Sequence, residues 1–202
     1  MGVDMVELDV HESLDGEFMV IHDRDLRRIS GRKEVVRDTN SRILRAIELH
    51  NNEKLLLLRE VFELLPDRIG IMVELKCIRS RQKMANFITA RSRERAVVLA
   101  SFDLSLIRGL RDCSLNLPLG IVTHSLTNIS KARAMGISFA NVCLDFQAIN
   151  GRAVEELKRH NHEIYAWTLD RAEDIRRIAG FGVDGIITNR PDEVCKILAG
   201  TD

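Results

Sequence analysis

Glu7 and Asp9 lie two residues apart in one apolar, strand-like segment, and Glu74 and Lys76 lie two residues apart in another. Because successive side chains on a strand point to opposite faces, each pair is expected to share one face of its strand. Two carboxylates that point into a closed core are costly unless a cation or other partners neutralise them. On an exposed strand edge the same carboxylates would be solvated, as acidic side chains usually are. The residues alone leave both interpretations open.

At the carboxyl ends of neighbouring parallel strands in a barrel, Glu7, Asp9 and Glu74 would converge where barrel active sites lie. Three carboxylates there suit a hard divalent cation, Mg²⁺ or Ca²⁺, and Lys76 would add a positive charge for a phosphate oxygen. His22 ends a short predicted strand close to Asp9 and could protonate a leaving alkoxide. A lone histidine is more often structural, but one beside a carboxylate cluster is a better candidate for catalysis.

Short apolar segments alternate with helical patterns along the chain. The predicted strands span residues 5–11, 19–22, 70–76, 96–101, 117–123, 139–145, 163–168 and 185–188. The predicted helices span residues 57–65, 81–93, 104–111, 129–134, 151–159, 172–181 and 192–198. Repeated strand–helix units favour a parallel sheet with right-handed crossovers, and the nearly continuous apolar strands indicate burial on both faces.

The number of repeating units decides between two α/β folds. Residues 19–22 are expected to form a hairpin with the first strand, because Asp15-Gly16 is a turn signal, and seven strand–helix units then remain. A doubly wound sheet needs a Gly-rich phosphate loop or a switch point, and the sequence shows neither. The prediction is therefore an α/β fold, a (β/α)8 TIM-type barrel without its first strand and helix.

Local signals refine this outline. Asp170 is expected to cap the helix at 172–181, and Pro191 suits the first turn of the last helix. Segment 23–54 is polar, irregular and too long for an ordinary loop between a strand and a helix. We therefore expect it to be an insertion over one mouth of the barrel, where loops tend to carry function.

The composition is that of an ordinary globular protein with one domain over residues 1–202. Thirty Lys and Arg balance thirty Asp and Glu, so no net charge attracts nucleic acid or an anionic membrane. Four widely spaced cysteines predict reduced, mostly buried thiols rather than a zinc site or disulfides. No apolar run is long enough to cross a bilayer and the N-terminus lacks signal-peptide character, so we expect a cytoplasmic protein without a membrane span.

Four motifs, in order along almost the whole chain, resemble those of the glycerophosphodiester phosphodiesterase family. They are GVDMVELDVHESLDGEFMVIHDRDLRRISG at 2–31, MVELK at 72–76, SFD at 101–103, and IYAWTLD at 164–170 followed by GVDGIITNRPDEV at 182–194. The resemblance implies a TIM-barrel phosphodiesterase. It further implies these roles: Glu7, Asp9 and Glu74 hold a divalent cation, His22 is one of two catalytic histidines, Lys76 contacts phosphate, and Trp167 lines the substrate pocket.

The sequence also departs from the family pattern. The family opens with a strand ending in His-Arg-Gly and a helix beginning Pro-Glu-Asn-Thr, and neither occurs in this sequence. That His is the second catalytic histidine and that Arg binds phosphate, so weak or no activity is expected unless another group, such as His11 or His124, replaces the missing base. Asn189, where the family usually has Asp, is expected to be tolerated. Either the chain is a fragment of an ordinary enzyme, or it is a non-catalytic domain that binds a divalent cation or a phosphate ester.

The reaction implied by the resemblance belongs to lipid and glycerol metabolism. It is the metal-dependent hydrolysis of a small glycerophosphodiester, such as glycerophosphocholine, to sn-glycerol 3-phosphate and an alcohol. A relative that cleaves lysophospholipid head groups is the alternative, and an apolar mouth around Trp167 would favour it. A barrel without its first unit has two open parallel edges, so we expect poor stability alone or a homo-oligomer that covers the open edge.

Overall fold

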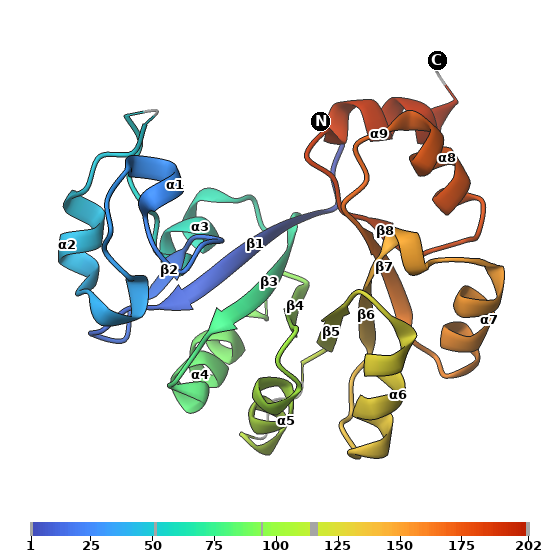
Figure 1. Cartoon of the computed structure of the whole chain (residues 1–202), viewed down its shortest axis with the longest axis horizontal. Coiled ribbons are helices and arrows are strands. Elements are labelled where there is room, and N and C mark those ends of the chain that lie inside the picture. Colours follow the sequence, from blue (N-terminus) through green and yellow to red (C-terminus); the bar gives the residue numbers. More distant parts are fainter. Residues whose placement is uncertain (1, 51, 94, 114–116, 201–202) are drawn as a thin grey trace.

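The computed structural model describes residues 2–50, 52–93, 95–113 and 117–200. Strands and helices alternate over most of this length (Figure 1). The strands are β1 (Met5–Glu12), β2 (Phe18–Val20), β3 (Gly70–Cys77), β4 (Val97–Ser101), β5 (Leu119–Thr123), β6 (Asn141–Asp145), β7 (Glu163–Trp167) and β8 (Gly185–Ile186). The α-helices are α1 (Arg27–Ser30), α2 (Ser41–Ala46), α3 (Leu58–Leu64), α4 (Arg81–Arg91), α5 (Leu104–Asp112), α6 (Leu126–Ala134), α7 (Gly151–Arg159), α8 (Ala172–Ala179) and α9 (Pro191–Ala199), with short 3₁₀ helices η1 (Val36–Asp38) and η2 (Phe146–Ala148).

The strands form one mostly parallel sheet, curved as a half-barrel, in the order β2-β1-β3-β4-β5-β6-β7-β8. Only β2 is antiparallel, and it pairs with the last residues of β1 as the predicted hairpin. Helices α4 to α9 lie along the outer side of the curved sheet (Figure 1). The α/β fold with barrel-type strand–helix repeats is therefore confirmed.

The two faces of the sheet bury different residues because side chains alternate along each strand. Leu8, Val10, Val73 and Leu75 belong to the large core between the sheet and the helices. The opposite, concave face carries a smaller apolar cluster formed by Met72, Val98, Ala100, Val122 and Cys143. Glu7, Asp9 and Glu74 alternate with the buried residues of the large core, so they lie on the concave face above this apolar cluster.

Segment 23–54 folds around a small core of its own. Leu26, Val36 and Leu44 are buried there together with residues from β2 and from the approach to α3. Helices α1 and α2 lie beside β2, beyond the carboxyl end of β1 (Figure 1). The first residues of the segment, 23–25, line a cavity next to Lys76, so this part of the segment is the part nearest the carboxylates.

Two local predictions need correction. Asp170 does not cap α8, which begins after Arg171 without a side-chain cap. Its carboxylate instead accepts hydrogen bonds from the Thr188 hydroxyl and from the backbone and side-chain nitrogens of Asn189. The four cysteines are free as predicted, but only Cys143 is buried.

Pro191 occupies the first turn of α9 as predicted. Gly136 and Gly182 follow α6 and α8 with positive φ angles of 67° and 75°, which glycine adopts without strain. Among the described residues, no helix combines the length and the apolar character needed to cross a membrane.

Candidate active site

Three carboxylates converge at the carboxyl ends of β1 and β3. Asp9 and Glu74 lie directly opposite each other in the parallel register, and Glu7 lies two residues before Asp9 on the same face. One oxygen from each of Glu7, Asp9 and Glu74 lies within 4.8 Å of the other two. The structure thus brings together the three residues that sequence analysis predicted as cation ligands.

Lys76 lies beside these carboxylates. Its ammonium nitrogen is 3.0 Å from Asp9 Oδ1 and also forms an ion pair with Glu74. Burial alone would lower the pKa of Lys76, but these contacts with Glu74 and Asp9 raise it above its ordinary value. The side chain is therefore a fixed positive charge at the edge of the cluster.

The carboxylates exceed the positive charge that Lys76 supplies. Burial, and then the negative charges of Asp9 and Glu74, raise the pKa of Glu7 to about 7. Burial also raises the pKa of Glu74, against the opposing effect of Lys76. Three hard oxygen donors with unneutralised charge form the kind of ligand set that Mg²⁺ or Ca²⁺ prefers, so the residues present fit a divalent cation.

His22 is held at the rim of the same cavity. Its Nδ1 lies 2.8 Å from Asp23 Oδ1, and Arg28 Nε donates to Asp23 Oδ2 at 2.7 Å. The hydrogen bonds from Arg28 and His22 lower the pKa of Asp23 to about 2, so this carboxylate stays charged. With Nδ1 donating to Asp23, the outer nitrogen, Nε2, is the one that can exchange a proton with a ligand.

His11 lies on the face of Glu7 and Asp9, as the alternation of side chains along β1 predicts, because Leu8, Val10 and Glu12 face the helices. The pairing of β1 with β3 shifts between Val10 and His11 because Lys76 of β3 has no partner there, and His11 lines a cavity together with His22 and Lys76. His11 is buried, and its Nε2 donates to the backbone oxygen of His22 at 3.1 Å. Burial lowers its pKa. His11 therefore supports the backbone of His22.

One wall of the cavity is aromatic. The ring centroids of Phe102, His124 and Trp167 lie 5.0–5.7 Å apart in pairs. His124 Nδ1 lies 2.9 Å from Asp145 Oδ2, and Trp167 Nε1 donates to the Cys143 oxygen at 2.9 Å. The wall carries a second histidine–carboxylate pair, His124 with Asp145, in addition to the pair formed by His22 and Asp23.

The carboxylates, His22, Lys76 and the aromatic wall line one cavity of about 450 Å³. Sequence analysis did not assign Phe102, Asp145 or Thr168 to a site. Phe102 and Asp145 each follow or end a parallel strand, and that position is the signal that could have indicated them. The cavity also contains Asn189, which is fixed by Asp170.

Fold and site together define a TIM-like α/β protein with a carboxylate-rich cavity at the carboxyl ends of its strands. Residues 1–193 match the model of the glycerophosphoryl diester phosphodiesterase family, and the chain belongs to this family. A glycerophosphodiester phosphodiesterase of Caldanaerobacter subterraneus subsp. tengcongensis is 26% identical over 211 residues, which cover 98% of this chain and 87% of that protein.

Solved structures share the fold of this chain. The glycerophosphodiester phosphodiesterase of Thermotoga maritima matches with a TM-score of 0.76 at 29% identity. The match covers 98% of this chain and 85% of the Thermotoga chain. An Oleispira antarctica phosphodiesterase, solved in complex with the product sn-glycerol-3-phosphate, has a TM-score of 0.84 at 17% identity. That match covers 98% of this chain and 86% of the other, and it supports the fold.

Proposed function

We propose that this chain is a cation-dependent phosphodiesterase that hydrolyses glycerophosphodiesters to sn-glycerol 3-phosphate and an alcohol. The observation that carries the proposal is the convergence of Glu7, Asp9 and Glu74 with Lys76 and His22 on one cavity. Family membership supports the reaction class. The product bound in the Oleispira antarctica relative supports the substrate class.

The carboxylates of Glu7, Asp9 and Glu74 would hold the divalent cation, Mg²⁺ or Ca²⁺. When bound, such a cation neutralises charge that develops on phosphoryl oxygens. Lys76 would contact a phosphate oxygen with the ammonium group that now bridges Asp9 and Glu74. Its two anionic partners keep it protonated, and a bound cation would free it to turn toward the substrate.

His22 would deliver a proton from Nε2 to the leaving oxygen. Its bond to Asp23 fixes the ring, and His11 fixes the backbone behind it. A positioned acid of this kind contributes about 10²–10⁴ in rate. Trp167 and Phe102 would form the wall against which the non-reacting part of the substrate packs.

His124 is the candidate for the second proton-transfer group. Among the described histidines, His22 and His124 line the cavity, and each has a carboxylate at its Nδ1. His124 would accept the proton of the attacking hydroxyl or water. The alternative, a domain that binds a cation or phosphate ester without turnover, assigns no such role to His124.

The aromatic wall favours a second substrate candidate. Phe102 is 42% exposed, and together with Trp167 and Ile187 it gives one side of the cavity an apolar surface. An acyl chain could pack there, as in a phosphodiesterase that removes the head group of lysophospholipids.

A ³¹P NMR assay tests these alternatives. The protein is incubated with glycerophosphocholine or with lysophosphatidylcholine, in Mg²⁺, in Ca²⁺ and in EDTA. Glycerol 3-phosphate formed only with a cation supports the proposal, and lysophosphatidate formed at the higher rate supports the second candidate. The absence of both products, with Ca²⁺ binding retained in calorimetry, would refute turnover and assign the non-catalytic alternative.

A further inference from the structure

A second cavity, of about 630 Å³, lies between α2 and the start of α3, within the lobe formed by segment 23–54. It shares no lining residue with the carboxylate cavity among the described residues. Its lining side chains include four cations, Arg42, Arg45, Lys54 and Arg59. The proposed phosphodiesterase reaction uses none of them.

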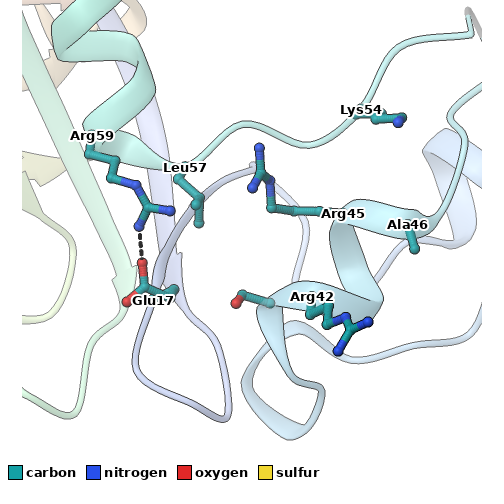
Figure 2. A pocket seen from close by; sticks show the side chains of 8 residues that line it. Glu17, Arg42, Arg45, Ala46, Lys54, Leu57 and Arg59 are labelled. Carbon is teal, nitrogen blue, oxygen red and sulfur yellow. Dashed lines mark hydrogen bonds and ion pairs between the residues drawn. The ribbon is translucent and has the colours of Figure 1, made fainter.

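The two central arginines extend toward the cavity from different elements. Arg59 comes from α3 and forms an ion pair with Glu17, whereas Arg45 comes from α2 (Figure 2). Arg45 forms an ion pair with Glu60 through one terminal nitrogen. Each guanidinium has five N–H donors, so these ion pairs leave most of the donors available.

One of the remaining donors is buried without a partner. Arg45 Nε is shielded from solvent, and its N–H group donates to no acceptor among the described residues. A buried unpaired N–H group of a charged side chain is costly unless a ligand or water satisfies it. This atom indicates that Arg45 is arranged for a group from outside the chain.

The charges around the cavity favour an anion. Glu17, Glu60 and Asp15 adjoin it, and Asp15 is already engaged by the Ser41 hydroxyl and backbone nitrogen at 2.8 Å each. Against these carboxylates stand the four lining cations and Lys83, which lies 3.5 Å from Glu17. Because the whole chain has no net charge, the excess of cations is a property of this lobe.

We propose that this cavity binds a phosphomonoester dianion. Planar guanidinium groups from two directions can each offer paired N–H donors to phosphate oxygens, and Lys54 adds a point charge. A dianion matches the excess of cations better than a carboxylate or a phosphodiester, each of which carries one charge. The ligand would be either a free phosphomonoester or the phosphomonoester head group of a membrane lipid.

Calorimetry in EDTA, with the full chain and glycerol 3-phosphate as the probe, tests the proposal without a cation in the carboxylate cavity. Arg45→Gln should weaken binding about tenfold or more, because it removes charge-assisted hydrogen bonds. Glu17→Gln should tighten binding severalfold, because it releases Arg59 from its carboxylate. Arg68→Gln, an exposed arginine outside the cavity, is the matched control and should leave binding unchanged.

Flotation with phosphatidylcholine vesicles, with and without phosphatidic acid, separates the two sources of ligand. Binding to phosphatidic acid vesicles that is lost in Arg45→Gln and kept in Arg68→Gln assigns the lipid source, and binding of glycerol 3-phosphate alone assigns the soluble one. If Arg45→Gln fails to fold, Lys54→Gln replaces it, because Lys54 is exposed. The absence of binding in both arms, or equal loss in Arg68→Gln, would overturn the proposal.

Discussion

At the scale of single residues, Glu7 shows how the site depends on a cation. Its carboxyl group is partly buried beside Asp9 and Glu74, and its pKa is raised to about 7. Without a cation this charge destabilises the folded chain, and with a cation it becomes a ligand. The same side chain should therefore affect stability in opposite directions under the two conditions.

We predict that Glu7→Gln raises the free energy of unfolding by about 1–2 kcal/mol in EDTA at pH 8, because it removes one of three clustered charges. In the same variant, Ca²⁺ should no longer stabilise the fold as it does in the unmodified chain. Urea denaturation with and without Ca²⁺ measures both effects. A loss of stability in EDTA would show that Glu7 is neutralised by contacts within the protein.

We predict that His22→Gln lowers the rate of glycerol 3-phosphate release by about 10²–10⁴ while cation binding stays unchanged, because His22 donates a proton and holds no cation. Steady-state kinetics with Ca²⁺ calorimetry on the same samples separates the two properties. The exposed His160→Gln is the matched control. Full activity in His22→Gln would remove this residue from the mechanism.

At the scale of elements, Glu12 connects the end of β1 to the start of α4. The buried carboxylate accepts hydrogen bonds from Arg79 N at 2.6 Å, Ser80 N at 2.8 Å and Ser80 Oγ at 2.6 Å. Although burial opposes the charged form, these bonds from Ser80 and Arg79 hold the pKa of Glu12 below its ordinary value. The contact fixes the strand that carries Glu7 and Asp9 against its neighbouring helix.

We predict that Glu12→Gln costs about 2 kcal/mol of stability at pH 7, because a buried charged acceptor is lost. A depressed pKa gives stability that is present above the unfolded-state value, near 4.5, and is lost as pH falls through the folded-state value. The difference in the free energy of unfolding between Glu12→Gln and the unmodified chain should therefore shrink as pH falls below about 4.5. Urea denaturation at pH 7 and at pH 4 checks this, with the exposed Glu63→Gln as control, and a difference that does not vary with pH would contradict it.

The elements also show what the sequence could predict. The alternation of side chains along a strand correctly predicted that Glu7, Asp9 and Glu74 lie together, because a parallel register brings strand ends together. Alternation also placed His11 on this face, but the bond of its ring to the backbone oxygen of His22 depends on how the chain returns after β2 and is known only from the fold. The helix-cap prediction failed for Asp170, because the competing partners Thr188 and Asn189 lie on another strand–helix connection and are known only from the fold.

At the scale of the whole molecule, the sheet ends in strands with little pairing. Among the described residues, β8 pairs only with β7, over two residues, and β2 pairs with only the last part of β1. Residues 5–8 of β1 pair with β3 on one side, so their other edge has free backbone groups in the part of the chain that the structure describes. Such edges favour association with another strand.

We predict that the chain forms a homo-oligomer through this edge at micromolar concentration. Sedimentation velocity over a range of concentrations measures the mass directly. A substitution of Met5 by proline, which removes a backbone donor on the open edge of β1, should shift the distribution toward monomer. A stable monomer at every concentration would contradict the prediction.

The central claim is that Glu7, Asp9 and Glu74 hold the cation on which phosphodiester hydrolysis depends. It is tested most directly by the rate of glycerol 3-phosphate release from glycerophosphocholine against Mg²⁺ or Ca²⁺ concentration, in the unmodified chain, in Glu74→Gln and in Glu63→Gln. We predict saturable, cation-dependent turnover that Glu63→Gln keeps and Glu74→Gln lowers by about a hundredfold or more. Turnover that persists in EDTA, or that Glu74→Gln leaves unchanged, would contradict the claim.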